Sequence, residues 1–227
     1  MKKTVIFFNV FLVCALLNAQ TFVSTEPMNR NVILEEFTGL RCGYCPQGHK
    51  VVQELVADNP ERFFAINLHQ GGLAIPNLSF PYDYRTEFGD PLAAQANVGG
   101  WPEGTVNRHL FTGEHTAMGR GHWEQFAGET MEQSSYVNVA ARSTLDPVQR
   151  LLTVTVELYY TGNSPAETNR INVALLQNNI IGPQSGMNDN PDNVVGDQYR
   201  HMHMLRHLIT GLWGDEIADV SEGSFVT

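Results

Sequence analysis

Two cysteines separated by two residues, Cys42 and Cys45, are the side chains whose type and spacing best suit chemistry. The sequence has one other cysteine, Cys14. If the segment that contains Cys14 is removed on export, the remaining two can bond only with each other or with a partner's sulfur. The motif therefore predicts a Cys42–Cys45 disulfide, and the chemistry open to such a pair is dithiol–disulfide exchange.

A structural disulfide and a metal site are the alternatives for this pair. A bond that closes so short a loop stabilises a protein by only about 2 kcal/mol in the chain-entropy model. A structural zinc site needs about four ligands, and the motif supplies two, with no histidine at a finger-like spacing. We therefore predict a redox-competent pair, with no metal and no cofactor.

The flanking residues predict elements that would position the pair. Residues 31–37 are mostly β-favouring and indicate a strand that ends before the motif. Pro46 suits the first turn of a helix, whose apolar face continues to residue 56 and which ends at residues 58–60. Cys42 would then lie near a helix N-terminus, where the macrodipole favours a thiolate. We assign Cys42 as the attacking thiolate and Cys45 as the resolving thiol.

Further elements complete an α/β domain over residues 30–133. A second strand is expected at residues 62–69, followed by a loop over residues 71–87 and a short helix at residues 91–97. A turn that contains Pro102 leads into a third strand, and residues 121–133 indicate a closing helix.

Residues 35–46 together with Trp101-Pro102 resemble the thioredoxin superfamily. The resemblance implies that Pro102 is a cis-proline beside the disulfide, with an ordinary trans turn as the alternative. It also implies that Glu36, six positions before Cys42, is a buried carboxylate that exchanges a proton with Cys45. The alternative for Glu36 is a solvent-facing strand residue, since Glu35 beside it points to the other face.

Three neighbours of the pair are expected to contact substrate. The Gly43-Tyr44 dipeptide resembles that of periplasmic disulfide isomerases, so Tyr44 is one of them. Arg41 stands where many thioredoxins have Trp, and its guanidinium would lower the thiolate pKa further. Trp101 precedes Pro102 and would narrow the groove. The expected partners are protein thiols or disulfides and a redox partner protein.

The sequence resembles the Omp28-related outer-membrane protein family of Gram-negative bacteria. The resemblance is carried by residues Glu35–Gly39, by Cys42–Pro46 and by the order of the elements that follow. This resemblance implies a protein of the periplasm or outer membrane. It also supports an alternative function: a surface protein with a non-catalytic thioredoxin-like fold and a structural disulfide, serving in binding or envelope organisation. Attachment to the envelope would be peripheral or through lipid.

From residue 136 onward the hydrophobic pattern changes to period two. Strands are expected at residues 136–140, 152–158, 172–177 and 199–208, with Asn- and Pro-rich turns between them. The pattern predicts an antiparallel β-sandwich, immunoglobulin-like, over residues 134–227. Four or five strands are fewer than the roughly seven of a closed sandwich, so we expect the module to be incomplete at its C-terminal end.

Histidines and acidic residues in this half offer weaker metal alternatives. His201 and His203 share one face of the expected strand, which we interpret as a mixed surface strand rather than a metal site. Residues 188–197 are rich in Asp and Asn, but they lack the regular spacing of an EF-hand, so a solvated loop is expected instead of a calcium site. His49 is expected to be a solvated helix residue.

The N-terminus and the overall charge define the setting. The N-terminus predicts a signal peptide over residues 1–19, because Lys2 and Lys3 are followed by an apolar run over residues 5–17 and by Ala19. A membrane anchor and lipidation of Cys14 are the alternatives. The sequence has 14 Lys and Arg against 24 Asp and Glu, a net charge of −10. Nucleic acid is therefore not an expected partner. A length of 227 residues suits two modest domains.

Overall fold

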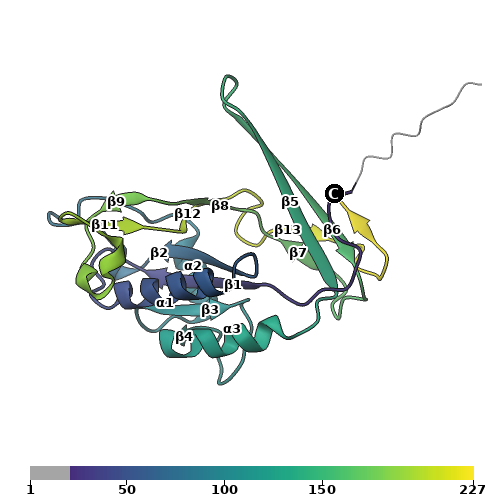
Figure 1. Cartoon of the computed structure of the whole chain (residues 1–227), viewed down its shortest axis with the longest axis horizontal. Helices are drawn as coiled ribbons and strands as arrows, with labels where there is room; N and C mark the ends of the chain where they lie inside the picture. The colour runs from purple at the N-terminus through teal and green to yellow at the C-terminus, as the bar shows by residue number, and fades with distance from the viewer. Residues whose placement is uncertain (1–20) are drawn as a thin grey trace, which may run out of the picture.

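The computed structural model describes residues 21–227; the expected signal peptide and Cys14 lie outside the described residues. A mixed six-stranded sheet, in the order β4-β3-β1-β2-β12-β8, forms the centre of the molecule (Figure 1). Its strands are β1 (Val32–Thr38), β2 (Phe63–His69), β3 (Glu103–Val106), β4 (Met118–Gly119), β8 (Ala174–Gln177) and β12 (Met204–Leu208).

Helices cover both faces of this sheet because successive strand side chains point to opposite sides. Val32 and Leu34 of β1 pack with Val52 of α1 and Trp123 of α3 on one face. Phe37 of β1 points to the other face and packs against α2. The helices are α1 (Cys45–Asp58), α2 (Gly89–Ala96) and α3 (Trp123–Met131), with single 3-10 turns η1 (Gly72–Ala74), η2 (Arg120–His122), η3 (Met187–Asp189) and η4 (Pro191–Asn193).

The first half of the chain follows the expected order of elements. β1 and β2 are parallel, with α1 as the connection between them, and β3 returns antiparallel to β1. Pro46 lies at the first turn of α1, where its missing N–H leaves no hydrogen bond unmade. The backbone N–H of Asn59 ends the helix by donating to the carbonyl of Leu55.

The second half does not form the separate β-sandwich that the sequence predicts over residues 134–227. β12 is parallel to β2 and pairs with it at Met204 and Asn67, and β8 pairs antiparallel with β12. These two strands thus extend the sheet of the first half, and a boundary at residues 133/134 does not separate two folding units. The expected strand over residues 199–208 is broken at His203, whose φ is +53°. Its first part, β11, joins a different sheet.

Three smaller antiparallel sheets complete the described residues, in the orders β10-β11-β9, β13-β7 and β14-β6-β5. Their strands are β5 (Val137–Asp146), β6 (Leu151–Tyr160), β7 (Asn169–Ile171), β9 (Ile180–Gly182), β10 (Val194–Val195), β11 (Gln198–His201), β13 (Asp215–Ile217) and β14 (Phe225–Val226).

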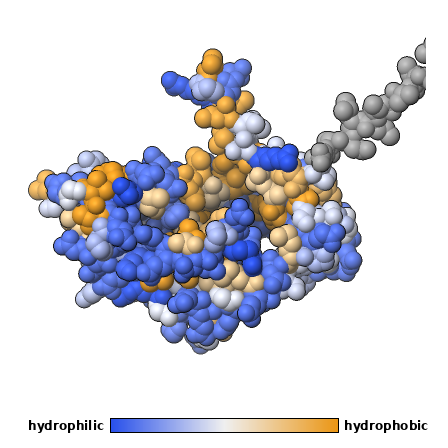
Figure 2. All heavy atoms as spheres, viewed as in Figure 1, coloured by the Kyte–Doolittle hydropathy of each residue, from blue (hydrophilic) through white to orange (hydrophobic). Residues whose placement is uncertain are grey.

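The β5–β6 hairpin projects beyond the rest of the molecule (Figure 1). Its cross-strand pairs place apolar side chains together on one face, among them Val139 opposite Leu158 and Leu145 opposite Leu152. Val139, Leu145 and Leu152 are 57%, 67% and 40% exposed. Figure 2 shows these apolar atoms along the projecting hairpin. The apolar face is continuous with a core around Leu158 and Tyr160 at the base.

Candidate functional site

Cys42 and Cys45 form the predicted disulfide at the N-terminal end of α1. Cys45 is the first residue of the helix, and the Cys42 N–H donates to the Gly39 carbonyl in the turn before it. Cys42 is only 2% exposed and Cys45 is fully buried, whereas Tyr44 between them is 66% exposed. The disulfide is therefore closed off from solvent, and Tyr44 is the exposed side chain of the motif.

Glu36 is completely buried behind the first turn of α1. It follows Val32 and Leu34 on the face of β1 that α1 covers, which places its carboxyl against Gly48, one turn after Cys45. A Cβ at Gly48 would lie 2.5 Å from Glu36 Oε1 and 3.1 Å from Pro102 Cβ. Burial raises the pKa of Glu36 well above its ordinary value, so the carboxyl is neutral over a wide pH range. The expectation that Glu36 is buried is confirmed.

Glu35 points to the opposite face and has a different environment. Arg108 binds it with two hydrogen bonds, from Nε to Oε2 at 2.8 Å and from a terminal nitrogen to Oε1 at 2.5 Å. The Thr105 hydroxyl donates to Oε2 at 3.2 Å. Glu35 is thus an ion-paired residue, while Glu36 is the uncharged one.

The Trp101–Pro102 peptide bond is cis, as predicted. Pro102 is buried against Gly48, so it lies beside Glu36 and the first turn of α1. The ring of Trp101 contacts the loop after β2, where a Cβ at Gly71 would lie 2.6 Å from Cζ2. Glycine is favoured at this position both by that contact and by its φ of +63°.

Arg41 is turned toward the same loop. One terminal nitrogen of its guanidinium donates to the carbonyl of Gly72, and its backbone N–H donates to the carbonyl of Leu73 at 3.0 Å. The side chain is half-buried. Arg41 therefore joins the residues before the disulfide to the loop that follows β2.

Residues 183–190, here called the covering segment, lie over the disulfide loop. The Ser185 N–H donates to the Leu40 carbonyl at 2.8 Å, and Gln184 Nε2 donates to the Cys42 carbonyl at 3.0 Å. Gly186 lies directly against the carbonyl of Gly43. The covering segment explains why Cys42 is buried, and nothing in the local pattern of the sequence indicates that a segment about 140 residues later covers it.

The predicted solvated loop over residues 188–197 is in part buried, contrary to expectation. Asn190 is fully buried, and its Nδ2 donates to the hydroxyl of Tyr199 at 3.0 Å. Asp189 Oδ2 accepts from Gln47 of α1 at 2.7 Å. Within residues 21–227, no group of three or more His, Cys, Asp or Glu side chains is arranged to hold a metal ion.

His49 of α1 is buried, and the prediction of a solvated residue is wrong. Its Nε2 lies 3.0 Å from Thr38 Oγ1, and its Nδ1 lies 3.0 Å from the Tyr199 hydroxyl. Glu36 Oε1 lies 3.8 Å from Nε2. Burial, with repulsion from His201 and His203, lowers the pKa of His49 to about 3. His49 is therefore neutral near pH 7, so its contact with Glu36 is not an ion pair.

The spacing of α1 carries a signal for the burial of His49. Residues 45, 49 and 52 lie on one face of a helix, and Cys45 and Val52 both point to the sheet. His49 should therefore point there too. Its hydrogen-bond partner Tyr199, which is 150 residues later, has no comparable signal.

His201 is also buried, and the prediction that it lies on a mixed surface strand is wrong. It packs edge-on against His69, Tyr84 and Tyr199, with ring centroids 5.7, 5.3 and 5.2 Å away. Burial lowers the pKa of His201 to about 4 and the pKa of His69 well below its ordinary value. His203 lies in the turn between β11 and β12 and does not share a strand face with His201.

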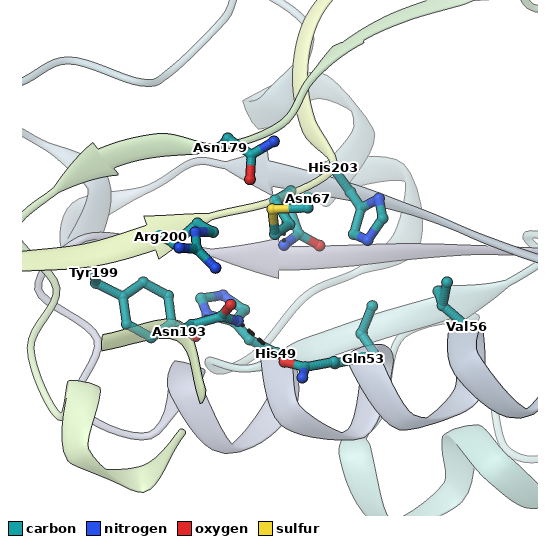
Figure 3. Close-up of a pocket in the computed structure, with 11 residues that line it drawn as sticks. His49, Gln53, Val56, Asn67, Asn179, Asn193, Tyr199, Arg200 and His203 are labelled. Carbon is teal, nitrogen blue, oxygen red and sulfur yellow. Dashed lines mark hydrogen bonds between the residues drawn. The ribbon is translucent and has the colours of Figure 1, made fainter. Parts of the chain in front are cut away.

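An open pocket of about 320 Å³ reaches the buried polar groups from outside (Figure 3). Figure 3 shows His49 and Gln53 on α1 facing Tyr199 and Arg200 on β11 across it. The side chains that line the pocket are His49, Val52, Gln53, Val56, Asn67, Asn179, Asn193, Tyr199, Arg200, Met202 and His203. The pocket thus reaches His49 from between α1 and β11.

Comparisons with solved structures find similar folds, among them the following two. HBP35 of Porphyromonas gingivalis has a TM-score of 0.63 and 22% identity, over 87% of this chain and 62% of that chain. Protein AGR_C_4864 of Agrobacterium tumefaciens has a TM-score of 0.54 and 14% identity, over 87% of this chain and 77% of that chain. The chain therefore spans about 62% of the length of HBP35. The comparison with curated proteins gives no match.

A family model described as outer membrane protein Omp28 matches residues 90–227, more than half of the chain. The match begins after the CxxC segment, so it rests on residues other than those that carry the resemblance in the sequence. In the part of the chain that the structure describes, no helix has the length and apolarity to cross a membrane. The chain belongs to the Omp28 family of outer membrane proteins, and its location is the outer membrane or periplasm of a Gram-negative bacterium.

Proposed function

We propose that the protein is an exported thiol–disulfide oxidoreductase that acts by exchange at Cys42 and Cys45. One observation carries the proposal: a neutral carboxyl, Glu36, is buried against the first turn of the helix that the disulfide begins. A buried acid with a raised pKa is suited to exchanging a proton with a thiol near neutral pH. A purely structural disulfide gains nothing from an uncharged carboxyl whose burial is unfavourable.

The finer fold assignment belongs to the same proposal. We assign the four strands β4-β3-β1-β2, with α1 and α3 on one face and α2 on the other, to a thioredoxin-like domain. The cis peptide before Pro102 and the disulfide at the start of α1 support this assignment. In this proposal β8 and β12 are additions to the thioredoxin-like sheet.

In the reducing direction the Cys42 thiolate attacks one sulfur of a substrate disulfide. A mixed disulfide forms, and the substrate's other sulfur leaves as a thiolate that takes a proton from solvent. Glu36 then gives up its carboxyl proton toward solvent and accepts the thiol proton of Cys45, and the Cys45 sulfur attacks the Cys42 sulfur. The Cys42–Cys45 bond forms, and the substrate's second sulfur is released. The substrate is reduced by two electrons, the protein is oxidised, and a redox partner protein must reduce it again.

The remaining side chains at the motif have supporting roles in this proposal. Tyr44 is exposed beside the disulfide and would contact a protein substrate. Arg41 and Trp101 hold the loop after β2 next to the motif and would form the side of the groove.

Reduction of insulin by dithiothreitol tests the proposal. The wild-type protein should accelerate precipitation of the insulin B chain, and Cys42→Ser should abolish the acceleration. Cys45→Ser should instead accumulate a mixed disulfide with the substrate, visible as a covalent adduct on a non-reducing gel. A wild-type rate equal to that of dithiothreitol alone would overturn the proposal.

A second function is favoured by the burial of both cysteines under the covering segment. In this alternative the fold serves binding or envelope organisation, and the disulfide is structural. A redox titration separates the two functions. Oxidoreductases have potentials between about −120 and −270 mV, whereas structural disulfides lie below about −300 mV.

A further inference from the structure

A continuous set of buried polar side chains connects Glu36 to the pocket between α1 and β11. Glu36 Oε1 lies 3.8 Å from His49 Nε2, and neither of its oxygens has a hydrogen-bond partner within residues 21–227. His49 Nδ1 lies 3.0 Å from the Tyr199 hydroxyl. His49 and Tyr199 both line the pocket of about 320 Å³.

This arrangement addresses a problem that the exchange reaction creates. The disulfide is closed off by the covering segment, so a proton that Glu36 takes from Cys45 has no direct route to solvent on that side. The pocket offers a route further along α1, because His49 both lies next to Glu36 and lines the pocket (Figure 3).

We propose that His49 relays protons between Glu36 and the pocket, with Tyr199 as the group that completes the path. The inference rests on the proposed function, since it concerns the second step of the exchange. His49 acts on the reacting sulfur only through Glu36, so it is a positioning and relay residue rather than a catalytic one.

In each transfer, Glu36, His49 and Tyr199 each accept one proton and release one proton. The protonated Glu36 carboxyl passes its proton from Oε1 to His49 Nε2, and the carboxylate so formed accepts the thiol proton of Cys45. The imidazole releases the proton on Nδ1 to the Tyr199 oxygen, while the Tyr199 hydroxyl proton leaves to solvent in the pocket. A return of both rings to their first tautomer and rotamer restores the path. No electrons move in these steps.

The geometry permits the one long step in this path. The carboxyl must approach Nε2 by less than 1 Å to reach hydrogen-bond distance from its present 3.8 Å. Because the described residues make no hydrogen bond to Glu36, none of them holds the carboxyl away. Thr38, two residues along the same face of β1, already holds Nε2 at 3.0 Å and fixes the direction of the ring.

Several other ionisable groups surround His49 and set its charge. Tyr199, His201 and His203 face it from β11 and the turn that follows, and Glu36 faces it from β1. His69 of β2 lies beyond His201. Lys50 and Glu54 pair with each other on the exposed side of α1, and Asp189 and Asp192 lie nearby on η3 and η4. These surroundings keep the imidazole neutral near pH 7, so it can both accept and release a proton.

A two-phase reaction of the reduced protein with 5,5′-dithiobis(2-nitrobenzoate) isolates the step. Attack by Cys42 releases one thionitrobenzoate, and resolution of the mixed disulfide by Cys45 releases a second. His49→Gln keeps a polar side chain of similar size but cannot relay a proton. His69→Gln makes the same change at another buried histidine that is outside the path.

We expect His49→Gln to slow the second release about tenfold at pH 7, with the first release unchanged; this is less than the roughly 10²- to 10⁴-fold of direct proton transfer, because His49 acts only through Glu36. The solvent deuterium isotope effect and the pH dependence of the second release should change with it. Tyr199→Phe should slow the second release similarly, and it serves as the second variant if His49→Gln does not fold. His69→Gln should leave both phases as in the wild type.

The outcomes distinguish the relay from the function on which it rests. If the wild type gives no second release, or a first release no faster than free cysteine, the proposed function is overturned and the relay with it. If the wild type gives both phases but His49→Gln and Tyr199→Phe leave the rate and pH profile of the second unchanged, only the relay is overturned.

Discussion

Gly186 of the covering segment lies so close to Gly43, between the two cysteines, that a Cβ on Gly186 would overlap the Gly43 carbonyl. The φ of Gly186 is +71°, a conformation that glycine adopts without strain. The covering segment can therefore lie this close to the disulfide loop because residue 186 is a glycine.

Gly186→Ala should lift the covering segment and expose the disulfide. We expect its reduction by dithiothreitol to become several-fold faster, as measured by alkylation of the freed thiols over time. Gly196→Ala is the matched control, since Gly196 also has a positive φ, +65°, but has no atom near its would-be Cβ. Equal reduction rates in the two variants would show that the contact with Gly43 does not shield the bond.

Glu36→Gln should stabilise the protein increasingly as the pH rises. In the unfolded chain Glu36 loses its proton near pH 4.5, whereas burial raises its pKa in the folded protein. Above pH 4.5 the folded state therefore binds more protons, and stability falls with rising pH until the folded pKa is reached. The variant escapes this loss, which amounts to about 1.4 kcal/mol per pH unit. Urea unfolding of both proteins at pH 5 and pH 8 measures it, with exposed Glu124→Gln as the control.

The buried histidines should produce the opposite dependence in acid. Burial lowers the pKa of His49 to about 3 and of His201 to about 4, and it lowers that of His69 as well. Below pH 6.5 the unfolded state binds more protons at each of these sites, so stability falls as the pH is lowered toward 4. Each histidine adds about 1.4 kcal/mol per pH unit to the slope of the unfolding free energy against pH. Above pH 4.5 the opposite slope from Glu36 cancels the contribution of one of the three histidines.

His201→Gln tests this dependence at a single site. The slope of unfolding free energy between pH 4.5 and 6 should decrease by about 1.4 kcal/mol per pH unit in the variant. Exposed His115→Gln should leave the slope as it is in the wild type. An unchanged slope in His201→Gln would mean that His201 is not held neutral by the fold.

Arg108→Met should destabilise the protein by leaving the Glu35 carboxylate buried without a partner. Removing one member of a buried ion pair costs about 3 to 5 kcal/mol, and the partial exposure of Arg108 reduces the expected loss to about 2 to 3. The double variant Glu35→Gln with Arg108→Met should recover part of that loss. If the two single losses simply add in the double variant, the residues do not interact energetically.

Replacing Leu145 and Leu152 by Thr should alter the surface of the hairpin without altering the fold. The two residues are cross-strand partners on the exposed apolar face, away from the core at its base. We expect the free energy of unfolding to change by less than about 1 kcal/mol. Binding of a hydrophobic dye to the folded protein should fall, and dye fluorescence equal to that of the wild type would contradict the assignment of this face as accessible.

Local patterns were sufficient to predict the first half of the chain. The CxxC motif followed by Pro46 predicted the start of α1, and the resemblance to thioredoxins implied that Glu36 is buried. These predictions depend on periodicity and on turn residues, which act over a few positions. They hold because the start and end of each element depend on residues within it or next to it.

The second half shows where such patterns stop being informative. Period-two alternation indicates that a strand has one buried face, but it does not say which sheet the strand joins. Both faces of β12 are buried at its first two residues, Met204 and Leu205, and β2, 137 positions earlier in the chain, lies beside it. The burial of His49 and Cys42 likewise depends on Tyr199 and Gln184, which no local pattern connects to them.

The position of β12 beside β2 has a consequence for how this protein reaches its final form. Until residues 204–208 have emerged, the outer backbone edge of β2 has no partner, and the side chain of Asn67 lacks the Met202 carbonyl to which it donates. A nascent or proteolytically shortened polypeptide that ends earlier would present this edge as a template for intermolecular strand addition. We therefore expect the central sheet to be completed only after residues 204–208 have crossed the inner membrane.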